Sequence, residues 1–166
     1  MQAFSHNLTT SIESIWLSIR VTPIGVFVIS KLFTDYEGKT EPVIPFGKQI
    51  VNHLIFWNER YLNRFKGVEV TGEEINNDVT FESGSLNGTV EEWQSTVSRL
   101  NSVMSEWTEA VKNCNPDKLH TSIVKDSDEP WSAAIANINI HNAYHTGQIL
   151  EIRKTEGIWD PKNGVH

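Results

Sequence analysis

Residues 89–111 read TVEEWQSTVSRLNSVMSEWTEAV. Within this stretch, apolar side chains recur at alternating steps of four and three residues, at Trp93, Val97, Leu100, Met104, Trp107 and Val111. This spacing places them along one face of an α-helix, and Thr89 with Glu92 has the form of a capping box at its start. The stretch therefore predicts an amphipathic helix whose tryptophan and methionine side chains lie in the core.

The same periodicity occurs in three other stretches, over residues 8–19, about 46–66 and about 130–154. The first of these helices is interrupted at Pro23, after which a further apolar segment runs to residue 32. No convincing sheet pattern accompanies them. A chain of 166 residues suits one domain. The sequence therefore predicts an all-α fold, a four-helix bundle in a single domain spanning residues 1–166.

Turn-forming residues mark the ends of the predicted helices. Gly67 follows the second helix and Gly157 follows the last one, as expected for residues that end helices. Residues 127–130 are expected to cap the start of the last helix, with Pro130 in its first turn.

The segment between the second and third predicted helices has a different composition. Residues 67–88 are rich in glycine, and residues 66–92 hold seven acidic side chains and one basic side chain. We interpret residues 67–88 as a long loop with a functional role, in which residues 68–70 and 79–81 alternatively form short strands.

Charge and cysteine content exclude several classes of function. The chain has 14 Lys and Arg against 21 Asp and Glu, a net charge of −7, and no basic cluster, so we expect no nucleic-acid partner. The single cysteine, Cys114, excludes an intrachain disulfide. The chain shows no signal peptide and no apolar run of about 20 residues, so we expect a cytoplasmic protein without a membrane segment.

Three histidines lie on the apolar faces of predicted helices. His141 and His145 share the inward face of the last helix about one turn apart, and His53 lies on the apolar face of the second. Two imidazoles four residues apart can bind one cation, although core histidines satisfied by hydrogen bonds give the same pattern. Three inward imidazoles in one small core would leave several polar nitrogens to satisfy, which a shared cation achieves.

Two motifs resemble those of the DinB-like superfamily of four-helix metalloproteins: VNHL at residues 51–54, followed by Trp57 and Glu59, and HNAYHTGQILEIR at residues 141–153. The resemblance covers essentially the whole chain. It implies an up-down-down-up bundle, often a homodimer, in which His53, His141 and His145 bind zinc, nickel or another divalent metal ion. Spacing alone does not identify His53 as the third ligand.

The resemblance also implies a chemistry. Enzymes of this superfamily include bacillithiol-dependent S-transferases and mycothiol-dependent maleylpyruvate isomerase. We therefore expect a metal-dependent transferase that acts with a low-molecular-weight thiol on a small electrophilic substrate, with the 67–88 loop shaping the substrate entrance. Two alternatives remain: a metal-dependent hydrolase, which needs a carboxylate base that the histidine face does not clearly offer, and a non-catalytic, metal-binding dimeric bundle.

Other residues on or near the histidine face are weaker candidates. Gln148 lies on that face and is expected either to orient a ligand or bound water or to make an ordinary core hydrogen bond. Asn52, Asn142 and Glu151 are less specific candidates. Gly147 is expected to allow close helix packing because it has no side chain.

Overall fold

A computed structural model describes residues 44–70, 75–82, 89–125 and 127–157. These residues form three α-helices and two short 3₁₀-helices, namely α3 (Ile44–Lys66), η1 (Asn77–Phe81), α4 (Val90–Lys112), η2 (Pro116–His120) and α5 (Trp131–Thr155). No strand forms within the described ranges, apart from one isolated bridge between Ser122 and Pro130. The all-α prediction is confirmed for this part of the chain. The helical segments predicted over 8–19 and up to residue 32 lie outside the described residues.

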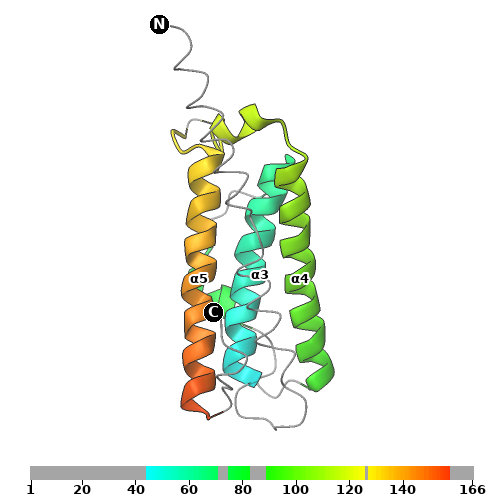
Figure 1. The fold of residues 1–166 in the computed structure, drawn as a ribbon, viewed down its shortest axis with the longest axis vertical. Helices are drawn as coiled ribbons and strands as arrows, with labels where there is room; N and C mark the ends of the chain where they lie inside the picture. Colours follow the sequence, from blue (N-terminus) through cyan, green and yellow to red (C-terminus); the bar gives the residue numbers. More distant parts are fainter. Residues whose placement is uncertain (1–43, 71–74, 83–88, 126, 158–166) are drawn as a thin grey trace, which may run out of the picture.

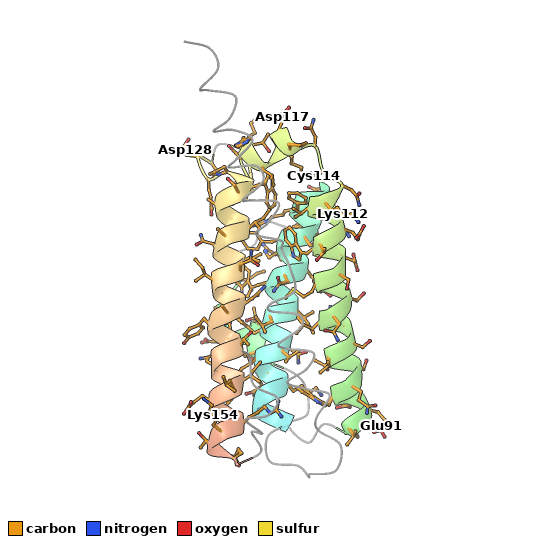
Figure 2. All side chains as sticks on the ribbon, viewed as in Figure 1. Glu91, Lys112, Cys114, Asp117, Asp128 and Lys154 are labelled. Atoms are coloured by element: carbon orange, nitrogen blue, oxygen red, sulfur yellow. The ribbon has the colours of Figure 1, made fainter. Side chains whose placement is uncertain are left out.

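The three α-helices run side by side, with α3 between α4 and α5 (Figure 1). Helices α3 and α4 are parallel: Lys48 pairs with Glu92 near their starts at 2.8 Å, and Lys66 pairs with Glu106 toward their ends at 2.6 Å. Helix α5 runs in the opposite direction. Figure 2 accordingly shows Glu91 and Lys154 at one end of the bundle and Lys112 at the other. This is the order expected for the last three helices of an up-down-down-up bundle.

Two helix ends follow the sequence prediction. The Thr89 side chain accepts a hydrogen bond from the Glu92 backbone at the start of α4. At the end of α3, Gly67 has a φ of 77°, and the backbone N–H groups of Gly67 and Val68 bond to the carbonyls of Arg64 and Asn63. Glycine adopts this left-handed conformation without the cost that a side chain brings.

The start of α5 differs from the prediction. Pro130 is the N-cap residue and not part of the first turn, and no side chain caps the helix. The reason is the bridge between Ser122 and Pro130, in which the Trp131 N–H donates to the carbonyl of Thr121. This contact holds Pro130 in an extended conformation, with a ψ of 157°, and α5 begins one residue later.

Parallel neighbours such as α3 and α4 require a connection that returns along the bundle. The segment that connects them in the chain, residues 67–89, is called the crossover here, and its described helix η1 packs against α3. Residues 79–81, for which a short strand was the alternative prediction, belong to η1. The crossover thus brings a short polar helix against the side of the bundle.

The core consists of two apolar clusters, one toward each end of α3. The first holds Val51, Leu54, Ile55, Trp93, Leu100, Met104 and Ile149, and the second holds Leu62, Phe65, Val103, Trp107, Trp131, Ala134, Ile135 and Ile138. The predicted burial of Trp93, Met104 and Trp107 is confirmed. Buried polar side chains that belong to neither cluster include His53, Asn58, Asn142 and His145. The core therefore contains a polar region.

Candidate metal centre

His53 from α3 and His141 and His145 from α5 meet in this polar region. The Nε2 atom of His141 lies 2.9 Å from Nε2 of His53 and 3.2 Å from Nε2 of His145. His53 is 2% exposed and His145 5% exposed, whereas His141 is half-buried. The antiparallel packing of α5 on α3 thus brings together residues that lie 88 positions apart in the chain.

The crossover determines which nitrogen of His53 carries a hydrogen. Nδ1 of His53 contacts Oγ1 of Thr80 in η1. The Thr80 hydroxyl donates its own hydrogen to the carbonyl of Asn77 at 2.6 Å, so it can only accept from His53. Nδ1 of His53 therefore carries the hydrogen, and Nε2 of the neutral ring presents a lone pair toward the other histidines.

Gln148 has the same effect on His145. Its Nε2 donates to the Tyr144 hydroxyl at 3.1 Å, which turns its Oε1 toward Nδ1 of His145 at 2.6 Å. An amide oxygen is an acceptor, so Nδ1 of His145 is the donor and its Nε2 presents a lone pair. Gln148, expected either to orient a ligand or bound water or to make an ordinary core hydrogen bond, thus bonds to His145.

Hydrogen bonds alone do not satisfy these three rings. The lone pairs of His53 and His145 both face Nε2 of His141, which carries at most one hydrogen and can donate it fully to only one of them. Nδ1 of His141 is buried without a hydrogen-bond partner among the described residues, whether it carries a lone pair or a hydrogen, so the conflict that a cation relieves is the one at the Nε2 atoms. A cation would accept all three Nε2 lone pairs.

The two nitrogen separations from His141 are close to those around a shared ion, and the ligand atoms of all three histidines lie within 4.8 Å of one another. Nitrogens bound about 2.1 Å from one zinc ion lie roughly 3.0–3.4 Å apart, depending on the coordination angle. The two Nε2 separations of 2.9 Å and 3.2 Å are close to this range. The three histidines thus form a cluster that could hold a metal ion.

Burial also keeps these rings in the neutral form that binds metals. Burial, together with electrostatic repulsion from His145 and His141, lowers the pKa of His53 to about 4. Burial is the main cause that lowers the pKa of His141, with a further contribution from His145. For His145, burial lowers the pKa and the hydrogen bond with Gln148 opposes that shift. All three imidazoles are therefore neutral at pH 7.

Aromatic side chains lie against the cluster. The Phe81 ring stacks on His53 with a centroid distance of 3.9 Å, and the Trp57 ring lies edge-on at 6.5 Å. Trp57 also donates through Nε1 to Oδ1 of Asn77, which fastens η1 to α3. Within the described part of the chain, carboxylates make their hydrogen bonds and ion pairs elsewhere, and none of these bonds involves the three histidines.

Comparison with known protein families agrees with this arrangement. The family model of the DinB superfamily matches residues 47–149, more than half of the chain. The chain belongs to the DinB superfamily. The match spans all three histidines and Gln148. No curated protein and no solved structure matches the chain.

Two residues of this DinB-superfamily site were not found by sequence reasoning. Thr80 lies in a segment without periodicity, so nothing in the sequence marked it as the partner of His53. Asn58 is fully buried and pairs with Asn142, which was only one of several weak candidates. A polar residue on the apolar face of the second predicted helix was the one available signal for Asn58.

The prediction for Gly147 is wrong. Gly147 is exposed, and a Cβ built on it would meet nothing within 4 Å among its neighbours, so it does not mediate close packing in the described structure. Cys114 lies at the end of the bundle beyond α4 (Figure 2) and does not belong to the histidine cluster. Among the described helices, none is both long and apolar enough to cross a membrane.

Proposed function

We propose that this member of the DinB superfamily binds a divalent metal ion, zinc or nickel, through Nε2 of His53, His141 and His145. The observation that carries the proposal is the pair of hydrogen bonds, to Thr80 and Gln148, that direct two imidazole lone pairs toward His141. Imidazole nitrogens are good ligands for both metals.

We further propose a transferase reaction between a low-molecular-weight thiol and a small electrophile. Three protein ligands are typical of catalytic zinc sites, whereas structural sites have four. When bound, the ion supplies Lewis acidity that favours deprotonation of a thiol at neutral pH. In this scheme Thr80 and Gln148 orient the ligand rings, and Phe81 shields one face of His53 from water.

The hydrolase alternative has less support. General-base activation of water requires a carboxylate or a similar group within hydrogen-bond reach. Among the described residues the three imidazoles bond to each other, to Thr80 and to Gln148, and not to a carboxylate. A thiol brings its own nucleophilic sulfur, so its reaction depends less on such a base.

Metal content tests the first part of the proposal. Protein purified without an affinity tag is expected to carry or take up close to one equivalent of metal, as measured by elemental analysis. His53→Ala and His141→Ala are expected to lose it while keeping a helical circular dichroism spectrum. His120→Ala is the matched control, because His120 is exposed on η2. Wild-type protein that takes up neither zinc nor nickel would overturn the proposal.

A thiol assay tests the second part. Zinc- or nickel-loaded protein is mixed with a low-molecular-weight thiol and a small alkyl or aryl halide, and loss of free thiol is followed by a colorimetric reagent. Acceleration in the wild type and in His120→Ala, but not in His141→Ala, is the expected result. Metal-loaded protein that accelerates no thiol reaction in such a panel would favour the non-catalytic dimeric alternative, which sedimentation analysis would test.

A further inference from the structure

Two buried asparagines pair with each other next to the histidine cluster. Nδ2 of Asn58 in α3 donates to Oδ1 of Asn142 in α5 at 2.8 Å, and Nδ2 of Asn142 donates back to Oδ1 of Asn58 at 3.1 Å. Asn58 has no exposed surface, and Asn142 is 5% exposed. Asn142 directly follows His141, so the amide pair and the histidine cluster share the same stretch of the α3–α5 interface.

Asn58 also connects the third described helix to this pair. Its Nδ2 donates to the carbonyl of Leu54 at 2.7 Å as well as to Asn142, which uses both amide hydrogens. Nε1 of Trp107 in α4 donates to the backbone carbonyl of Asn58 at 3.0 Å. Asn58 is thus hydrogen-bonded to both of the other described α-helices, and these bonds form only when α5 and α4 lie at one level along α3.

The aliphatic contacts around the pair are less directional than its two hydrogen bonds. On α5, the core side chains flanking the pair are Ala134, Ile135 and Ile138 on one side and Ile149 on the other, with Trp131 packed edge-on against Phe65 of α3 at the far end. Aliphatic contacts are non-directional and tolerate small shifts along a helix. A slip of one turn moves a side chain about 5.4 Å along the axis, which would break both amide bonds and separate His141 from His53. Buried asparagines are known to set helix register in coiled coils.

We propose that Asn58 and Asn142 are positioning residues that set the register of α5 against α3, so that His53 meets His141 and His145. This inference rests on the proposed metal function, because the register matters to the chain through the ligand set that it assembles. Asn142 also acts on its neighbour His141: burial lowers the pKa of that ring, and the Asn142 side chain opposes the shift. The ligand nitrogens make their geometric hydrogen bonds to one another, to Thr80 and to Gln148, so we assign the pair a positioning role.

The test replaces both asparagines by leucine, which has nearly the same shape. Removing both partners leaves no unpaired amide, so the double variant is expected to match or exceed the wild type in thermal stability. Its affinity for zinc alone, measured by competition with a chromophoric chelator, is expected to fall at least tenfold. In the metal-free protein, the nuclear Overhauser effect between ring protons of His53 and His141 is expected to weaken or vanish.

A purely structural role predicts a different pattern. Val103→Ala is the control, since it removes buried apolar volume from the second cluster without touching the amide pair; it is expected to lower stability and leave zinc affinity within twofold. The proposal is overturned if the double leucine variant keeps both the zinc affinity and the ring-proton contact. If leucine prevents folding, the double alanine variant is judged by the same two readouts. Wild-type protein that binds no metal would refute the proposed function. Comparing the ring-proton contact between His53 and His141 in the wild type and in the double variant would still test whether the asparagines set the register of α5.

Discussion

Replacing Thr80 by valine removes the acceptor for the Nδ1 hydrogen of His53 and changes the side-chain volume very little. The metal-free protein has two responses. His53 can keep its hydrogen on Nδ1, now buried without an acceptor, or move it to Nε2, where it would donate to Nε2 of His141 across 2.9 Å. The second response restores a hydrogen bond but removes the lone pair that a metal needs.

The size of the effect follows from these two states. A buried donor left without an acceptor costs about 1–3 kcal/mol, and loss of an outer hydrogen bond to a metal-binding histidine typically lowers metal affinity about 10–100-fold. That range corresponds to roughly 1.4–2.7 kcal/mol of binding free energy. Because the tautomer change compensates the metal-free protein, we expect Thr80→Val to weaken zinc binding by more than it lowers the free energy of unfolding.

Zinc competition titrations and urea unfolding of the metal-free protein measure these two quantities. Thr80→Ser keeps the hydroxyl and is expected to bind zinc nearly as the wild type does. Thr96→Val makes the same change on α4, where the hydroxyl donates to the carbonyl of Glu92, and is expected to have no effect on affinity. A Thr80→Val protein that binds zinc within twofold of the wild type would refute the assignment of the His53 tautomer.

Three further predictions concern the site and its scaffold. Gln148→Leu removes the acceptor for Nδ1 of His145 and is expected to lower zinc affinity about tenfold in the same titration. The pKa of His53 falls from an ordinary 6.5 to about 4 on folding, so between these values the unfolded chain binds more protons than the folded one. The contribution of His53 to the stability of the metal-free protein is therefore complete above pH 6.5 and is lost as the pH falls toward 4. Equal urea midpoints at pH 7.5 and pH 4.5 would contradict this. Gly67→Ala is expected to destabilise the protein by about 1 kcal/mol because φ is 77°, whereas Gly147→Ala, in an open helical position, is expected to stabilise it by about 0.5–1 kcal/mol; urea midpoints that move in the same direction would refute the argument.

Features that depend on near neighbours in the chain could be predicted from the sequence. The repeat from Trp93 to Trp107 predicts a helix and its buried face, and the Thr89 cap confirms where that helix begins. His141 and His145 share one face because four residues make about one helical turn. The contact between His145 and Gln148 also lies within one turn of α5.

Features that depend on two separate elements could not be predicted in this way. Thr80 reaches His53 only because the crossover between parallel helices carries η1 past that level of α3. Pro130 was placed one residue too far into α5, because the backbone of Thr121 pairs with the start of that helix.

For the described residues, the sequence alone determines the three long helical segments, their apolar faces and the inward placement of the three histidines, because helical periodicity is a local property of the chain. The tertiary structure decides that His53 and His141 lie 2.9 Å apart and that their outer partners leave lone pairs directed inward. Periodicity selects a face but leaves the axial register between two helices open. That register depends on directional contacts between distant residues, such as Asn58 with Asn142, which exist only once the helices have packed.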